Sequence, residues 1–141
     1  MDAMRLLHRI ARPMMAGFWL YSGYDAAAHP DRTAARAEPV TRRLAPLLGL
    51  PVDPELHVRV TGACQVGAGI LLASGRLPRL AAAVLALTTV PTTLAEHRFW
   101  AVEDPVEARE ARVHFLKNLA MLGGLVNAVA AGRVSRRAGR G

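Results

Sequence analysis

The chain has 141 residues, of which 52% are hydrophobic and only 5% aromatic, and its formal net charge is +7. This length corresponds to one domain, 1–141, and the apolar residues are mostly Ala, Leu and Val, which pack well in helices. The alternating pattern of strands is absent, and the single cysteine, Cys64, excludes an intramolecular disulfide. The fold class that we predict is all-α, with Cys64 as a small packing residue inside a helix.

Four apolar segments predict membrane-spanning helices at about 13–29, 57–75, 77–97 and 113–132. Each segment is apolar around its whole circumference, whereas the helices of a soluble bundle carry a charged outer stripe. Glycines inside the segments favour close helix packing in a membrane. We therefore predict an integral membrane four-helix bundle. A soluble four-helix bundle is the alternative, because the mean hydropathy of the chain is only +0.19.

The first segment shares features with a secretory signal peptide, since Arg5, Arg9 and Arg12 precede an apolar stretch. Trp19 and Asp25 lie within that stretch and disfavour cleavage. We therefore interpret the segment as a retained first helix, preceded by a short amphipathic lead-in that lies on the membrane surface.

The connector 30–56 is too polar to span a membrane. Leucines and valine recur at helical spacing in 34–48 with arginines between them, which predicts an amphipathic surface helix interrupted at Pro39 and Pro46. Asp53 is placed to cap the second spanning helix. Residues 75–79 predict a tight turn between the second and third spanning helices, and 97–113 a charged loop before the fourth.

Positive charge is densest at both termini and in the 75–79 turn, which share one side of the predicted bundle. The positive-inside rule then places both termini in the cytoplasm of a plasma-membrane protein. The tail arginines are expected to contact anionic lipid: Arg133, Arg136, Arg137 and Arg140. Nucleic-acid binding is not expected, because no aromatic residues alternate with these arginines.

Polar residues inside the predicted helices gather at the other end of the bundle, where the first and third helices end and the second and fourth begin. They are the candidate binding residues of the chain: Asp25, Gln65, Glu96, His97, His114, Lys117 and Asn118. Ionisable groups at membrane depth are costly and usually functional. The alternative is internal pairing, with Asp25 bound to an arginine such as Arg59 or Arg98 and Gln65 in an interhelical hydrogen bond.

This set of polar groups beneath apolar walls suits a quinone. A quinone headgroup needs hydrogen-bond donors and a titratable partner for its protons, and its isoprenoid tail needs access to lipid. No helix carries the paired inward histidines that haem requires. Glu110 and His114 have i,i+4 spacing but no accompanying metal motif, so neither haem nor a metal is expected.

Several segments together resemble the DoxX family of small four-helix membrane proteins: Ala11-Arg12-Pro13, Gly23-Tyr24-Asp25-Ala26, and residues 60–69, 75–79, 90–100 and 114–120. The resemblance covers most of the chain between residues 12 and 125. It implies a relation to a small subunit of a quinone-linked thiosulfate oxidoreductase and to membrane redox and thiol-stress complexes. The resemblance also implies that the seven polar residues named above lie at polar positions of the family, but it assigns no individual role to any of them.

We predict that the protein is a DoxX-type membrane subunit of an oxidoreductase or thiol-stress complex. Its role there would be to anchor the complex or to interact with quinone. Its partners would be the other oxidoreductase subunits. The alternative is a non-catalytic membrane scaffold that recruits soluble partners through 97–113 or the arginine tail. A small-solute transporter fits less well, because four short helices enclose little volume. The sequence leaves open whether the chain catalyses a reaction and whether it forms an oligomer.

Overall fold

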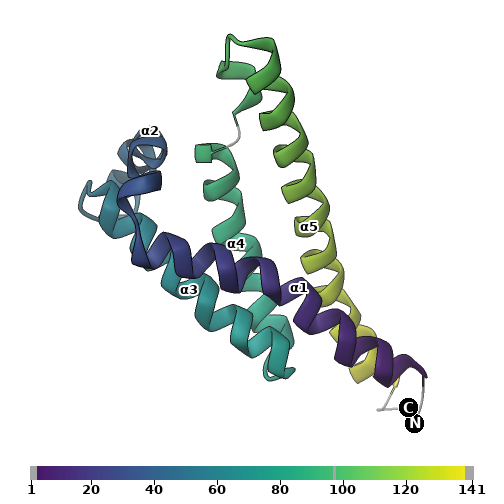
Figure 1. The fold of residues 1–141 in the computed structure, drawn as a ribbon. Helices are drawn as coiled ribbons and strands as arrows, with labels where there is room; N and C mark the ends of the chain where they lie inside the picture. The colour runs from purple at the N-terminus through teal and green to yellow at the C-terminus, as the bar shows by residue number, and fades with distance from the viewer. Residues whose placement is uncertain (1–2, 97, 139–141) are drawn as a thin grey trace.

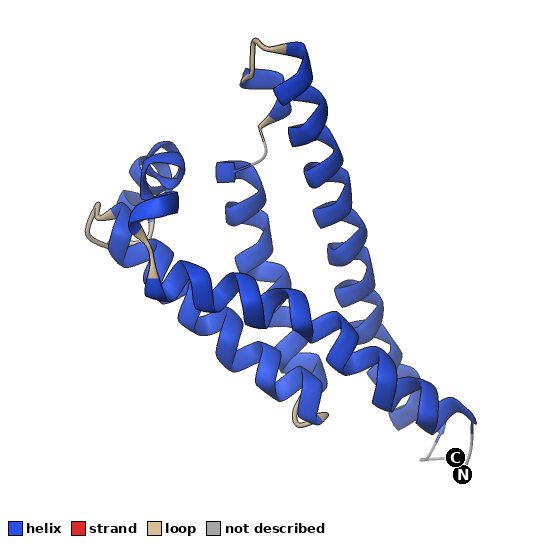
Figure 2. Ribbon diagram, in the orientation of Figure 1, coloured by secondary structure: helices blue, strands red, loops and turns tan. Residues whose placement is uncertain are grey.

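The structure, a computed structural model, describes the backbone of residues 3–96 and 98–138 and the side chains of 6–7, 9–95 and 98–130. Helices joined by short loops make up this part of the chain, and it contains no strand, which confirms the all-α prediction (Figures 1 and 2). The elements are α1 (Ala3–Ala28), α2 (Asp31–Leu47), α3 (Pro54–Ser74), α4 (Pro78–Glu96), the short 3-10 helix η1 (Phe99–Ala101) and α5 (Pro105–Ala138). The Arg133–Arg140 tail, whose lipid contact was predicted, lies outside the described side chains.

Four long helices alternate in direction along the chain. α1 packs against α3, α3 against α4 and α4 against α5, while α2 lies across α3 and α4. Figure 1 shows α1 and α5 close together at the lower right and diverging toward the top, so that they form a V with α4 behind it. We call the open end of this V, where α1 and α4 end and α3 and α5 begin, the polar end.

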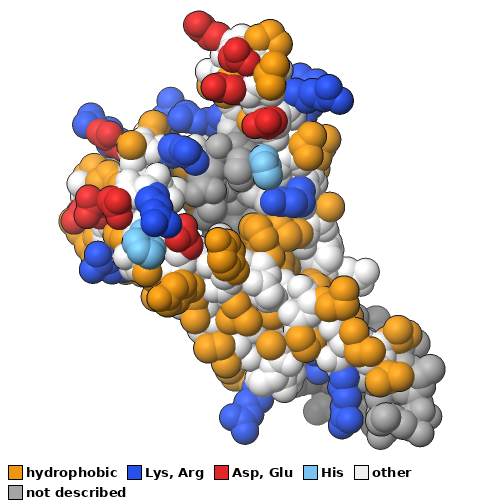
Figure 3. All heavy atoms as spheres, in the orientation of Figure 1, with side chains coloured by type: hydrophobic (Ala, Val, Ile, Leu, Met, Phe, Trp, Pro, Cys, Tyr) orange, Lys and Arg blue, Asp and Glu red, His pale blue; other side chains and the backbone are white. Residues whose placement is uncertain are grey.

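Three segments of the described chain are long and apolar enough to cross a membrane: Pro54–Ser74, Pro78–Ala101 and Pro105–Ala130. They correspond to α3, to α4 with η1, and to most of α5. α1 is not among them, because Arg5, Arg9, Arg12 and Asp25 lower its hydropathy, so its crossing stays a prediction. In Figure 3, apolar side chains cover the middle of the molecule and charged ones gather at the polar end.

Two glycines bring α1 and α3 into direct backbone contact. A Cβ atom added to Gly62 would lie 2.5 Å from the carbonyl oxygen of Gly23, and one added to Gly23 would lie 2.7 Å from that of Gly62. Such close crossings are typical of membrane helices that pack through small residues. Gly17, Gly67 and Gly123 have no atom within 4 Å of an added Cβ, so the predicted role of glycine in packing does not extend to them.

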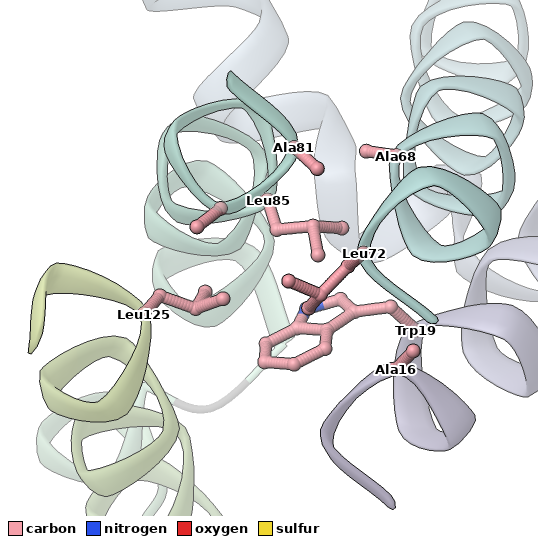
Figure 4. Packing of buried hydrophobic residues seen from close by; sticks show 8 residues of the cluster. Ala16, Trp19, Ala68, Leu72, Ala81, Leu85 and Leu125 are labelled. Atoms are coloured by element: carbon pink, nitrogen blue, oxygen red, sulfur yellow. The ribbon is translucent and has the colours of Figure 1, made fainter. Parts of the chain in front are cut away.

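The apolar core lies below the polar end and is centred on Trp19, which is 1% exposed. Figure 4 shows its indole ring surrounded by Leu72, Leu85 and Leu125, from three other helices. Indole Nε1 donates to Thr89 Oγ1 at 3.1 Å, and that hydroxyl donates to the Leu85 carbonyl oxygen at 2.6 Å. The polar edge of the ring is therefore satisfied inside the core, as a buried tryptophan requires.

The prediction that the connector helix is interrupted at Pro39 and Pro46 is wrong. The helix continues through Pro39 and Pro46 without interruption. Proline removes the hydrogen bond to the carbonyl four residues earlier, and Ala35, four residues before Pro39, is exposed, so solvent can replace that bond. α2 also does more than lie on a surface, since Thr41 and Ala45 are buried where it crosses α3 and α4.

The prediction of a charged loop over 97–113 is wrong for most of that stretch, because α5 begins within it. The helix begins at Pro105, so most of that stretch is helical. Asp104 accounts for the early start, because its Oδ1 accepts hydrogen bonds from the backbone nitrogens of Val106 at 2.8 Å and Glu107 at 3.0 Å. Pro105 fits the first helical position, where its missing N–H leaves no bond unmade.

Cys64 is exposed on α3, so the prediction that it packs inside the bundle is wrong. Apolar character around a whole helix does not indicate which face a residue occupies. The neighbouring residue, Gln65, occupies the inner face instead.

Candidate ligand-binding site

A cavity of about 440 Å³ lies at the polar end of the bundle and receives side chains from all five α-helices. This volume is within the range of roughly 300–1,000 Å³ that is typical of small-molecule sites. Its walls combine apolar residues, among them Phe18, Val40, Val58 and Ala95, with hydroxyl, amide and charged groups. It lies at the upper end of the molecule as drawn in Figure 3, where charged side chains gather.

Four of the seven candidate residues line this cavity: Asp25, Gln65, His114 and Lys117. They come from α1, α3 and α5, which the alternating helix directions bring to one end, as the sequence predicted. The side chain of Glu96 and the whole of His97 lie outside the described residues. Asn118 is described but is not part of the lining.

Gln65 is the most unusual member of the site. Its side chain is 4% exposed and lines the cavity, yet it makes no hydrogen bond to any residue that the structure describes. The interhelical bond left open by the sequence is therefore not formed in this part of the chain. Its amide atoms are not among the fully buried polar atoms of the described chain, so they open into the cavity and are free to bond a ligand or water there.

Asp25 forms an ion pair at the end of α1. Its Oδ1 lies 2.9 Å from Arg32 Nη1 and 3.5 Å from His29 Nδ1. The arginine comes from α2, and neither Arg59 nor Arg98, the partners suggested by the sequence, takes this place. The Asp25 side chain is 40% exposed, so the pair contributes at most about 1 kcal/mol to stability. Its structural effect is to hold the first turn of α2 beside the cavity.

His114 and Lys117 form the opposite wall, on α5. Lys117 Nζ lies 3.3 Å from His114 Nδ1 and 5.0 Å from the centre of the Phe18 ring on α1. A lysine over an aromatic face is held by a cation–π attraction. This contact joins α1 and α5 across the V, beside the cavity.

Asn118 lies against α4 instead of facing the cavity. Its Nδ2 donates to Thr93 Oγ1 at 3.1 Å, and its Oδ1 is buried without a partner. Asn118 follows His114 by one helical turn, which is why the sequence suggested a shared face. Because of its hydrogen bond to Thr93, Asn118 contributes instead to the packing of α5 against α4.

Three basic residues of the lining were missed by sequence reasoning: Arg32, Arg36 and His57. Because the connector was interpreted as a surface helix, its arginines were not expected to reach the cavity. The available signal was the spacing of Arg32, Arg36 and Val40, which places all three along one face of α2. His57 is held at the start of α3 by a contact of 2.7 Å between its Nε2 and the Pro51 carbonyl oxygen.

An aromatic cluster stands next to the cavity. The rings of Phe99, Trp100 and Phe115 lie 5.1–5.8 Å apart between centres, and Arg112 lies over Phe99 at 5.2 Å. The cluster holds η1 on α5 and leaves Trp100 57% exposed. An exposed tryptophan at the end of a spanning helix suits an anchor at the membrane interface.

Comparison with known families gives a match to the DoxX family model over residues 7–98. The chain belongs to the DoxX family. The matched stretch contains α1 to α4, and with them Asp25 and Gln65, whereas His114 and Lys117 on α5 lie beyond it. The resemblance inferred from sequence is thus confirmed at the level of the family, although the match ends before residue 125.

No curated protein and no solved structure matches the chain. Membership of DoxX and the three long apolar helices establish a membrane protein with an all-α fold. Contact with the lipid bilayer follows from the same two findings.

Proposed function

We propose that this DoxX protein binds a quinone headgroup in the cavity and acts as a membrane subunit of an oxidoreductase or thiol-stress complex. The observation that carries the proposal is Gln65, an inward-facing residue whose amide opens into the cavity and has no hydrogen-bond partner among the described residues. A ligand carbonyl would accept the hydrogen bonds that this amide can donate.

The remaining lining suits the same ligand. Lys117 is a second donor for a carbonyl oxygen, placed on the opposite wall of the cavity. Phe18, Val58 and Ala95 provide apolar surface for the ring. α1 and α5 diverge toward this end of the bundle (Figure 1), and an isoprenoid tail would leave the cavity between them.

A bound quinone would supply electron transfer coupled to the uptake and release of protons. The chain itself would bind and orient the headgroup through Gln65 and Lys117. Asp25, which lies beside Arg32 at the edge of the cavity, would hold or release a proton at its carboxylate. The electron donor would be a partner subunit, because the described chain is a bundle of helices without a separate catalytic domain.

We further propose that α1 is a fourth spanning helix and that both termini face the cytoplasm of the plasma membrane. α1 packs along α3 through the contact of Gly23 with Gly62, as a spanning neighbour would. The end opposite the cavity carries Arg9, Arg12 and the arginines of the α3–α4 turn, which supports that side as the positive one.

Replacement of Gln65 tests the proposal. The chain purified from native membranes in mild detergent is expected to contain close to one lipoquinone per chain, measured by extraction and chromatography. Gln65→Leu removes both donors while keeping a similar volume, so the quinone content should fall at least about tenfold, as expected for losing hydrogen bonds in a buried site. Asn127→Leu is the matched control, since this amide lies exposed on α5 outside the cavity.

Equal quinone content in wild type and Gln65→Leu would contradict the site. Absence of quinone from the wild type would favour the scaffold function instead. One observation supports that alternative: the first turns of α5 stand clear of the bundle in Figure 1 and carry exposed charges, among them Glu107, Arg109 and Glu110. A soluble partner that co-purifies with the quinone-free chain would then become the subject of study.

A further inference from the structure

Positive charge around the cavity is not balanced within the described lining. Three permanent cations, Arg32, Arg36 and Lys117, share the cavity with one carboxylate, Asp25. Asp25 is already paired with Arg32 at 2.9 Å. Among the described side chains of the lining, two cations from opposite walls therefore remain without a carboxylate.

Arg36 lies one turn after Arg32 on α2 and also lines the cavity. It has no hydrogen bond or ion pair to any residue that the structure describes. The nearby carboxylate of Glu38 is taken by Arg42, at 2.5 Å. Nothing in the described part of α2 therefore neutralises Arg36.

Lys117 faces the cavity from α5 and is also without an anionic partner. Its contacts within the described chain are the His114 ring nitrogen and the face of Phe18. Neither contact carries a negative charge. Both side chains are exposed and partly screened by solvent, but they line one concave site, and two cations that face the same space attract an anion more strongly than either does alone.

We infer that the cavity binds a phosphate oxyanion between the α2 and α5 walls. This goes beyond the quinone proposal, and the anion would compete with a quinone headgroup for Lys117 and Gln65, so the chain is freed of quinone before the test below. Arg36 and Lys117 would provide the charge, while the amide of Gln65 and the hydroxyls of Thr33 and Thr61 line the same space as further hydrogen-bonding groups.

The phosphate could belong to the headgroup of an acidic phospholipid or to a free anion. The lipid is favoured because the cavity lies at the end of a membrane protein where α1 and α5 diverge (Figure 1), and acyl chains would leave it toward the bilayer between these helices.

The test is a binding titration of the full chain in a neutral detergent, read by native mass spectrometry and thermal shift. Dioctanoyl phosphatidylglycerol is compared with dioctanoylglycerol, which lacks the phosphate, and with inorganic phosphate. We expect one saturable phosphatidylglycerol site per chain. Arg36→Gln and Lys117→Gln should each weaken it about fivefold, as expected for removing a partly screened charge. Arg43→Gln is the matched control, because Arg43 is exposed further along α2 and does not line the cavity.

Saturable binding of inorganic phosphate in competition with phosphatidylglycerol would support a free anion as the source, and binding of phosphatidylglycerol alone would support the lipid. Three outcomes would overturn the inference: no saturable binding of either, dioctanoylglycerol binding as tightly as phosphatidylglycerol, or Arg43→Gln weakening the site as much as Arg36→Gln does. Arg36 is exposed, so its replacement is not expected to affect folding. A chain that is quinone-free as purified and binds phosphatidylglycerol would contradict the quinone proposal alone.

Discussion

Gly62→Leu is expected to lower the free energy of unfolding by about 3 kcal/mol or more, at the upper end of the cost of overpacking a core. The added side chain would meet backbone atoms and not flexible side chains, since its Cβ would lie 2.5 Å from the Gly23 carbonyl oxygen and 2.7 Å from the Ala27 nitrogen. α1 would have to move away from α3. Because Asp25 lies in this part of α1, the cavity should also lose its shape.

Gly67→Leu on the same helix is the control for this prediction. Nothing lies within 4 Å of a Cβ at Gly67, and helix propensity favours leucine over glycine by up to about 1 kcal/mol. Denaturant titration in mixed micelles should therefore separate the two variants by several kcal/mol. Similar stability of both variants would contradict the close crossing of α1 and α3.

Trp19→Ala is the second change with a large expected effect, about 3–5 kcal/mol of destabilisation. The indole is 1% exposed and contacts residues of α3, α4 and α5, so its removal leaves a cavity where the four long helices meet. It also removes the hydrogen bond from Nε1 to Thr89 Oγ1. Trp100→Ala should cost far less, because Trp100 is 57% exposed.

Intermediate variants divide the effect of Trp19 into two parts. Trp19→Phe keeps most of the apolar contact and loses the hydrogen bond, so it should cost about 1–2 kcal/mol. Unfolding curves for Trp19→Ala and Trp100→Ala that nearly coincide would contradict the position of Trp19 in the core.

The helices and the polar end were predictable from sequence because long apolar segments separated by polar turns alternate in direction. Asp25, Gln65, His114 and Lys117 fall at one end for that reason alone. The face that each residue occupies was harder to predict where a helix is apolar all round. Cys64 and Gln65 are neighbours on α3, and only the contact with α1 decides that Gln65 is the inner one.

Tertiary contacts account for the other departures from prediction. α2 passes through two prolines because it packs on α3 and α4, and this packing brings Arg32 and Arg36 to the cavity. The ion pair of Asp25 with Arg32 joins the end of α1 to the next helix, a pairing that a connector interpreted as surface-lying does not suggest. Asn118 shares a helix face with His114 in projection but is drawn to Thr93.

The most direct test of the quinone proposal is photolabelling of the wild-type chain in lipid nanodiscs with a photoreactive quinone analogue, followed by peptide mapping. We predict labels on residues that line the cavity, in the segments 18–26, 57–65 and 114–117, and loss of these labels with excess unlabelled quinone. Labels restricted to the outward apolar residues, such as Leu87 and Val126, or labels that excess quinone does not displace, would contradict a quinone site in this cavity.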